Sequence, residues 1–319
     1  MTEPSPAPEL RVASLLPSAT EIVCLLGGET NLVGRSHECD HPPSVADRPV
    51  LTASKVELSP SSLKIDRDVR ALLTHALAVY DIDTERLREA RPDWIVTQDL
   101  CDVCAVSYAD VERACAELLP GTRIVNLHPT RWSEVMGDIL KVAEALAVPE
   151  RGEREVARLE ERKAAIEERS AALDTRPKTL TIEWIDPVMV GGTWMPELVA
   201  AAGGEALVTR RGDHAPTLTK PELAALDPAP EVVLIKPCGF GLERSRSEFD
   251  ILQALFQGLD WPALRDGRVF VADGNAFFNR PGPRLLESIE ILAACLHPRE
   301  FADLAERHAA HHEPFPLAD

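Results

Sequence analysis

The sequence predicts an α/β protein with two Rossmann-like lobes, each built on a parallel sheet, joined by one long backbone helix. Short apolar strands alternate with helical patterns on both sides of the midpoint of the 319-residue chain, as in parallel sheets covered on both faces. One charged helix separates the two series, and a strand, a helix and a Gly-Gly pair recur in that order in each half. We therefore expect an N-terminal α/β lobe at residues 10–148, a connecting helix at 149–174 and a C-terminal α/β lobe at 175–319.

The N-terminal half begins with an apolar strand at residues 11–16. Pro17 then opens a helix in which Ser18 is the expected N-cap and Glu21 completes a capping box. Gly27-Gly28 ends this helix, and residues 44–83 show no clear pattern. The other elements expected in this half are strands at 31–35, 92–97 and 121–127 and helices at 84–90, 107–119 and 133–147.

Residues 149–173 predict one unbroken helix of about six to seven turns. Pro149 suits the first helical position, and Val156, Leu159 and Ile166 mark one narrow apolar stripe, which Lys163 and Ser170 continue, on an otherwise charged surface. Such a helix has too little apolar surface to form the centre of a core. Its periodicity leaves two interpretations open: a strut that joins two lobes, or an ordinary surface helix of one large domain.

Beyond this helix the alternation of strands and helices restarts. A helix at 196–202 ends at Gly203-Gly204, just as the first helix of the chain ends at Gly27-Gly28. Thr219 is the expected N-cap of a short helix that runs to residue 226. The other expected elements are strands at 179–185, 206–209, 231–236 and 268–273 and helices at 243–258 and 284–296. A histidine-bearing tail follows, which we expect to be loosely attached.

Composition excludes several classes of partner. The net charge of −18 argues against nucleic acid and anionic membrane surfaces, since both require basic patches. No apolar run approaches about 18 residues, so we expect no membrane insertion. The first ten residues lack the basic and apolar regions of a signal peptide, which predicts a cytoplasmic protein whose seven cysteines are mostly thiols. Cys24, Cys115 and Cys295 lie in apolar helical patterns and are expected in the core.

Polar loops follow the predicted strands, and ligands of open α/β sheets bind beyond the carboxyl ends of the strands. If the two lobes face each other, these loops line one cleft. Trp184 and Trp194 suit either core packing or a flat wall for a macrocycle, and Arg280 suits an acidic ligand group. The candidate ligand-binding residues are Ser18, His37, Gln98, Trp184, Trp194, Cys238, Phe240, Asn279 and Arg280.

One set of loop residues has the composition of a metal site. His37, Cys39, Cys101 and Cys104 supply one imidazole and three thiolates, which suits tetrahedral zinc or iron at metal–sulfur distances of about 2.3 Å. A complete zinc ribbon has two CxxC pairs, whereas here one CxxC is paired with HxC. Three interpretations stay open: a metal or metal-chelate site, a redox-active thiol pair, and buried thiols without chemistry.

Several of these stretches together resemble a known family. They are Leu16-Pro17-Ser18-Ala19-Thr20-Glu21, Gly27-Gly28, Leu32-Val33-Gly34 and Asn279-Arg280-Pro281-Gly282-Pro283-Arg284. They resemble the class III, or helical-backbone, periplasmic binding proteins, which receive cobalamin, heme, siderophores or metal ions for ABC importers. Within that family, three stretches look most like a cysteine-bearing, signal-peptide-free subgroup of the vitamin B12-binding branch: His37-Glu38-Cys39-Asp40, Gln98-Asp99-Leu100-Cys101 and Pro237-Cys238-Gly239-Phe240.

This resemblance covers nearly the whole chain and implies a receptor that holds a corrinoid such as cobalamin, or a related metal chelate, in the interlobe cleft. Without export, an ABC permease is not an expected partner, and the chelate itself is the expected one. The loop residues leave a second interpretation, a metal-dependent enzyme with zinc or iron bound by His37, Cys39, Cys101 and Cys104. A thiol-based sensor or scaffold is a third.

Overall fold

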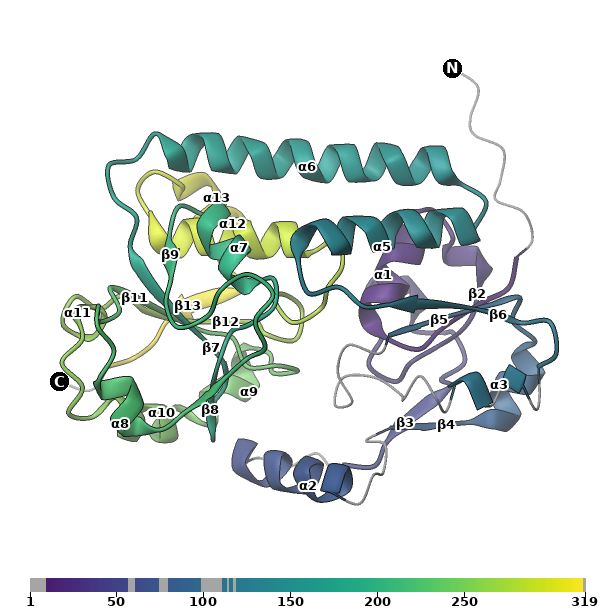
Figure 1. Cartoon of the computed structure of the whole chain (residues 1–319), viewed down its shortest axis with the longest axis horizontal. Coiled ribbons are helices and arrows are strands. Elements are labelled where there is room, and N and C mark those ends of the chain that lie inside the picture. Colours follow the sequence, from purple (N-terminus) through teal and green to yellow (C-terminus); the bar gives the residue numbers. More distant parts are fainter. Residues whose placement is uncertain are drawn as a thin grey trace. The chain divides into compact units, whose positions relative to one another are not determined.

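The computed structural model of the chain describes residues 10–56, 61–74, 80–98, 111–113, 115–116 and 119–317. The described residues divide into two compact units, each with an α/β sheet of its own (Figure 1). Within the described ranges, unit 1 takes residues up to 58, 67–129 and 133–158, and unit 2 takes 59–66, 130–132 and the residues from 159 onward. Among these residues, none of the helices combines the length and the apolar character needed to cross a membrane.

Unit 1 is built on an all-parallel sheet whose described strands have the order β2-β1-β5-β6. They are β1 (Val12–Ser14), β2 (Leu32–Arg35), β5 (Trp94–Gln98) and β6 (Arg123–Leu127). All residues of β1 are buried, because it lies between β2 and β5. Since the strands are parallel, the loops after β1, β2 and β5 leave the sheet at the same edge.

The helix that follows β1 does not begin as the sequence predicts. Leu16 is the N-cap residue of α1 (Pro17–Leu25) and makes no side-chain cap, so the predicted capping box of Ser18 and Glu21 is wrong. Pro17 occupies the first helical position, which places Ser18 inside the first turn, where its hydroxyl is too late in the helix to serve as the cap. The other helical segments described before α6 are η1 (Glu29–Asn31), η2 (Pro43–Val45), α2 (Ser62–Thr74), α3 (Thr84–Ala90) and α5 (Trp132–Ala145).

A short antiparallel pair of strands lies in the segment whose sequence shows no clear pattern. The strands β3 (Thr52–Ser54) and β4 (Tyr80–Ile82) pair Thr52 with Ile82 and Ser54 with Tyr80. The backbone N–H of Leu51 donates to the carbonyl of Arg35 at 2.8 Å, so β3 starts beside the end of β2. This arrangement brings Thr52 and Tyr80 to the loop that follows β2.

Unit 2 is built on a mixed sheet in the order β10-β8-β7-β11-β12-β13, with β9 beside β7. The centre, β7-β11-β12, is parallel as predicted, whereas β8, β10 and β13 add antiparallel strands at the sides. The strands are β7 (Lys178–Trp184), β8 (Val188–Val190), β9 (Glu205–Ala206), β10 (Thr217–Leu218), β11 (Val232–Ile235), β12 (Val269–Ala272) and β13 (His312–Pro314).

The helices of unit 2 are mostly short. The helix expected at 243–258 is two helices, because Glu248 is the N-cap residue of the second and its buried carboxylate accepts hydrogen bonds from Ser62 N–H at 2.5 Å and from Arg244 at 3.1 Å. The first residue of α2 is therefore anchored within unit 2. The helices are α7 (Met195–Ala201), α8 (Lys220–Ala224), α9 (Leu242–Arg246), α10 (Phe249–Phe256), α11 (Pro262–Arg265), α12 (Leu285–Leu296) and α13 (Ala302–Arg307).

The C-terminal tail is part of unit 2, and the prediction of a loosely attached tail is wrong. Strand β13 pairs with β12, and Phe315 is buried in the hydrophobic core of this unit. Its ring lies edge-on to Phe249 and Phe256, with ring centroids 4.8 and 5.6 Å apart. Burial of this aromatic ring attaches the tail to unit 2, although most of the tail sequence is polar and rich in histidine.

The connecting helix α6 (Pro149–Ala171) is unbroken, as predicted, and passes from unit 1 to unit 2 at residues 158–159. Its predicted stripe is confirmed, because Leu159, Ile166 and Ser170 are buried. In unit 1, Gly152 allows close packing of α6 on α5, since a Cβ at this position would lie 2.5 Å from the Cβ of Ala143. The chain thus has the long backbone helix that the predicted fold class requires.

The two Gly-Gly pairs end their helices in the same way. Gly27 and Gly203 have φ angles of 71° and 87°, the left-handed conformation in which glycine commonly ends a helix. Gly27 lies against Arg151 of α6 in unit 1, and Gly203 lies against Ser170 of α6 in unit 2. The weak sequence repeat therefore corresponds to a repeated structural element, a helix whose glycine end packs on α6.

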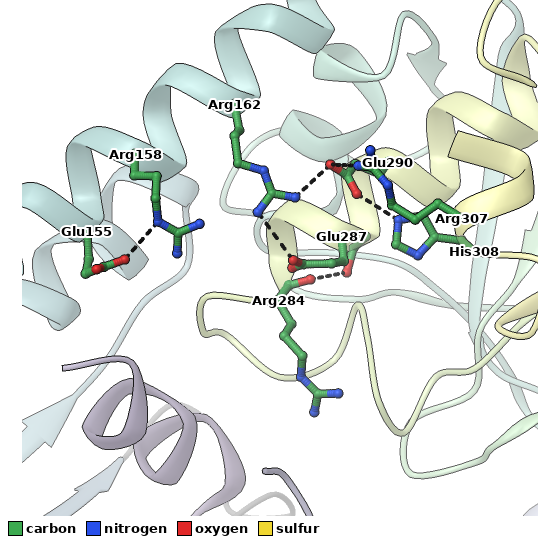
Figure 2. Close-up of polar contacts among 9 residues, drawn as sticks. Glu155, Arg158, Arg162, Arg284, Glu287, Glu290, Arg307 and His308 are labelled. Atoms are coloured by element: carbon green, nitrogen blue, oxygen red, sulfur yellow. Dashed lines mark hydrogen bonds and ion pairs between the residues drawn. The ribbon is translucent and has the colours of Figure 1, made fainter. Parts of the chain in front are cut away.

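An interior ion network joins α6 to α12 and α13 in unit 2 (Figure 2). Arg162 of α6 lies 2.8 Å from Glu290 and 3.6 Å from Glu287, both on α12. Glu290 also accepts a hydrogen bond from Arg307 at 3.1 Å and lies 2.7 Å from Nε2 of His308. Because Glu290 and His308 are buried, these contacts are screened far less than surface ion pairs.

Candidate functional site

Three of the predicted site residues of unit 1 follow or end neighbouring strands of its parallel sheet. Ser18 lies just after β1, His37 just after β2, and Gln98 is the last residue of β5. Ser18 is 2% exposed and Gln98 is 4% exposed. The hydroxyl of Ser18 and the amide oxygen of Gln98 have no hydrogen-bond partner among the described residues. Buried polar atoms of this kind are normally paired, so each would gain a missing hydrogen bond from a molecule that reached it.

The imidazole of His37 is held from β3. Nδ1 of His37 lies 2.7 Å from the hydroxyl of Thr52, and the backbone N–H of His37 donates to the same oxygen at 3.1 Å. Burial lowers the pKa of His37, and the charge of Arg35 acts in the same direction, while Glu38 opposes them. The ring is therefore neutral at pH 7 and retains a nitrogen lone pair.

Thr52 and Tyr80 belong to this cluster and were not predicted as site residues. The Tyr80 ring packs beside the His37 ring, with centroids 5.1 Å apart, and its hydroxyl donates to Glu38 at 2.8 Å. Both residues come from β3 and β4, in the stretch without a clear sequence pattern. No local signal identifies them, because only the pairing of these strands brings them to His37.

Cys39 lies deeper than its neighbour His37. It is 2% exposed, and the Thr20 hydroxyl donates to its Sγ at 3.0 Å while also lying 2.8 Å from the hydroxyl of Ser14. Cys101 and Cys104 lie outside the described residues. Within the part of the chain that the structure describes, no group of three or more His, Cys, Asp or Glu residues is arranged to hold a metal ion. The four-residue metal site therefore stays a prediction.

The remaining cysteines differ in depth. Cys115 and Cys295 are buried as predicted, whereas Cys24 is half-buried. Burial raises the pKa of the Cys24 thiol to about 12, with smaller contributions in the same direction from nearby acidic groups, and burial also raises that of Cys295. These thiols are therefore protonated at pH 7 and poorly suited to nucleophilic or metal-binding roles.

In unit 2, the two predicted tryptophans occupy different environments. Trp194 is buried, and its indole N–H donates to the carbonyl of Phe278 at 2.7 Å. Trp184 is half-buried at the end of β7, and its ring lies 5.2 Å from that of Phe240, which carries the guanidinium of Arg244 on its face at 4.0 Å. Trp184 thus keeps part of its aromatic surface exposed, whereas Phe240 and Trp194 are both buried.

A fully buried lysine organises the carboxyl ends of β7 and β11. Nζ of Lys236 donates to Glu183 at 2.9 Å and to the amide oxygen of Asn279 at 2.8 Å. The Asn279 amide group donates in turn to the carbonyls of Lys236 and Gly274. Lys236 was not predicted as a site residue, although a lysine directly after an apolar strand is the signal that could have identified it.

The two other predicted residues of unit 2 lie in the same region. The backbone N–H of Cys238 donates to the carbonyl of Glu183 at 3.0 Å, and its thiol is half-buried. Arg280, next to Asn279, is 8% exposed and donates to the side-chain oxygen of Asn275 at 2.9 Å. Asn279, Cys238 and Glu183 are thus connected through backbone and side-chain hydrogen bonds around Lys236.

Comparisons with known proteins agree with this architecture. The model of the periplasmic binding protein family matches residues 12–276, and no curated protein gives a significant match. Similar solved structures include a periplasmic heme-binding protein from Pseudomonas aeruginosa, at 21% sequence identity and a TM-score of 0.69, covering 91% of this chain and 93% of that one. A periplasmic vitamin B12-binding protein of Vibrio cholerae has 18% identity and a TM-score of 0.64, with coverages of 90% and 96%.

A third similar structure is that of a possible iron-binding, periplasmic solute-binding protein from Staphylococcus epidermidis. It has 17% identity and a TM-score of 0.67, and the match covers 90% of this chain and 98% of that one. At these identities the likeness establishes the fold alone.

Proposed function

Because the chain belongs to the periplasmic binding protein family, we propose that it is a substrate-binding protein whose ligand is a corrinoid such as cobalamin or a related metal chelate. Two of the similar structures are named for heme and vitamin B12, which are both metal complexes of a macrocycle. The ligand class of the proposal is therefore one that this fold is known to accommodate.

One observation in unit 1 carries the proposal. The unpaired atoms of Ser18 and Gln98 and the neutral imidazole of His37 follow neighbouring parallel strands at one sheet edge. A buried polar atom without a partner costs about 1–3 kcal/mol, so a ligand that hydrogen-bonds to Ser18 and Gln98 gains that energy. The corrin rim carries amide groups, whose N–H bonds match the amide oxygen of Gln98 and the hydroxyl of Ser18.

The aromatic surface of unit 2 gives further support. Trp184, the half-buried last residue of β7, offers apolar contact area to a flat macrocycle, and the buried ring of Phe240 packs beside it. Arg280 follows Asn279 in sequence, and its guanidinium donates to the side-chain oxygen of Asn275. Its positive charge suits an acidic substituent of the ligand.

Binding measurements test the proposal directly. Purified protein is titrated with hydroxocobalamin, hemin and free zinc, followed by visible spectroscopy and calorimetry. We expect saturable binding of one chelate per chain, with the corrinoid bound more tightly than hemin. If neither chelate binds, the proposed function is wrong.

A matched pair of variants tests whether the corrinoid binds at this edge of the sheet of unit 1. Gln98→Leu removes the unpaired amide oxygen and should weaken corrinoid binding about fivefold to tenfold. Gln257→Leu changes an exposed glutamine of unit 2 and serves as the control. Equal affinities of the two variants would remove Gln98 from the site.

The relatives named above are binding proteins, so the interpretation as a metal-dependent enzyme gains no support from them. The cytoplasmic location and the absence of a permease partner also remain predictions. Cell fractionation with an antibody to the chain, together with co-purification from membranes, checks both.

A further inference from the structure

The imidazole of His37 is engaged at one nitrogen only. Its Nδ1 lies 2.7 Å from the hydroxyl of Thr52, and its Nε2 makes no hydrogen bond with any residue that the structure describes. Building on the function proposed above, we infer that His37 coordinates the metal of the bound chelate through Nε2. We further infer that Thr52 is the positioning residue that presents it.

The hydrogen bonds around Thr52 accommodate a ring proton on Nδ1. The Thr52 hydroxyl donates its single proton to Ser36 Oγ at 3.1 Å and accepts the backbone N–H of His37 at 3.1 Å. In this arrangement the hydroxyl accepts from Nδ1, so a ring hydrogen on Nδ1 has a hydrogen-bond acceptor there. The lone pair then lies on Nε2, which is the atom left for a metal.

The same contacts fix the orientation of the ring. Thr52 and Ser36 are both buried, and Ser36 Oγ also accepts the backbone N–H of Glu38 at 3.3 Å. Since the backbone and the ring of His37 bind one hydroxyl, rotation of this side chain is restricted. Metal-binding histidines usually donate their second ring N–H to a carboxylate, a backbone carbonyl or water, which sets the tautomer and the orientation. The Thr52 hydroxyl occupies that position beside His37.

A single imidazole suits a metal that a macrocycle already encloses. A tetrapyrrole-type chelate supplies the equatorial ligands and leaves axial positions for the protein, and histidine is a common axial ligand of such metals. Tyr80 and Cys39 also have suitable chemistry, but the Tyr80 hydroxyl donates to Glu38 at 2.8 Å, and Cys39 is buried with its Sγ accepting from Thr20 at 3.0 Å. His37 therefore presents the ligand atom that needs no rearrangement.

The test uses the full chain with hemin and with cob(II)inamide, a paramagnetic corrinoid that has no nitrogen base of its own. Visible absorption and electron paramagnetic resonance report whether a nitrogen atom is an axial ligand. We expect this signature with wild type. His37→Ala should lose the signature and bind the chelate about tenfold more weakly, and free imidazole should restore the signature.

Thr52 is tested by two substitutions. Thr52→Val keeps the shape but removes the hydroxyl, so we expect an altered axial-ligand spectrum and an affinity about tenfold lower, whereas Thr52→Ser should retain both properties. His214→Ala, in an exposed loop of unit 2, is the control and should behave as wild type.

The outcomes separate the two proposals. If wild type binds neither chelate, the proposed function and this inference both fail. If the chelates bind but His37→Ala keeps the nitrogen signature, or only Tyr80→Phe changes the spectrum, the inference is overturned while the proposed function stands. If Thr52→Val matches wild type in spectrum and affinity, Thr52 has no positioning role.

Discussion

Replacing Glu290 with glutamine tests the interior ion network between α6 and the helices α12 and α13 (Figure 2). The carboxylate of Glu290 contacts Arg162, Arg307 and His308 at 2.8, 3.1 and 2.7 Å. Burial alone would raise the pKa of this carboxyl, but the hydrogen bonds and charges of these partners lower it from 4.5 to about 2. The folded protein therefore favours the ionised form more strongly than the unfolded chain does.

The size of this preference sets the expected effect. A pKa lowered from 4.5 to about 2 corresponds to roughly 3 kcal/mol of stability from the ionised carboxylate. Glu290 is 3% exposed, so solvent screens little of this contribution. Glutamine keeps the shape but not the charge, and we expect Glu290→Gln to lower the free energy of unfolding by about 2–3 kcal/mol at pH 7.

The pH dependence has a defined sign. Because the folded-state pKa of Glu290 is depressed, its contribution is complete above the unfolded value of 4.5 and is lost as the pH falls toward 2. The stability difference between wild type and variant should therefore shrink over that interval. Urea unfolding at pH values from about 7 down to about 3 measures it.

Glu287 provides the matched control, one turn away on α12. Burial raises its pKa, and the charge of Arg162 only partly offsets this, so the ionised form is disfavoured in the folded state. Glu287→Gln should leave stability at pH 7 unchanged or slightly higher. A loss below about 1 kcal/mol for Glu290→Gln, or equal losses for the two variants, would refute the reasoning.

Three further predictions concern the stability of unit 2, measured by denaturant unfolding. Gly203→Ala should lower the free energy of unfolding by about 1–2 kcal/mol or more, because φ is 87° and a Cβ would lie 2.8 Å from the Cβ of Ser170. Gly258→Ala is the control, at φ 80° with nothing within 4 Å of the added Cβ, and should lower it less. Equal losses for the two variants would exclude a role for the contact with α6. Thr219→Ala should cost about 1 kcal/mol, since the capping box with Glu222 is present, and an unchanged stability would contradict this. Lys236→Met should cost about 3 kcal/mol or more, because it leaves Glu183 without its buried partner, and a neutral effect would show that Glu183 is adequately solvated.

The positions of three candidate residues could be predicted from the sequence because their chemistry and their place after a strand coincide. Ser18, His37 and Gln98 were selected because they come directly after or at the end of apolar strands, and the parallel sheet places them at one edge. The role of Ser18 nevertheless changed. Its hydroxyl was assigned to the helix cap, yet Pro17 moves it into the first turn and leaves it unpaired.

The partners of His37 show where such reasoning stops. Thr52 lies fifteen positions from His37 and is held there by β3, whose pairing with Tyr80 on β4 joins distant segments. Neither strand has an extended alternating pattern, because each spans only three residues. The hydrogen bonds that fix the imidazole thus depend on contacts that local sequence does not encode.

The sequence by itself determined the two α/β halves, the long helix α6 between them and the paired Gly-Gly helix ends. These features follow from periodicity and from the backbone preferences of proline and glycine, which act over a few neighbouring residues. Only the tertiary structure decided the contact of His37 with Thr52, the burial of Lys236 between Glu183 and Asn279, and the attachment of the tail through Phe315. Each of these depends on strands and loops that meet only once the chain is folded, because hydrogen bonding and burial are set by neighbours in space rather than in sequence.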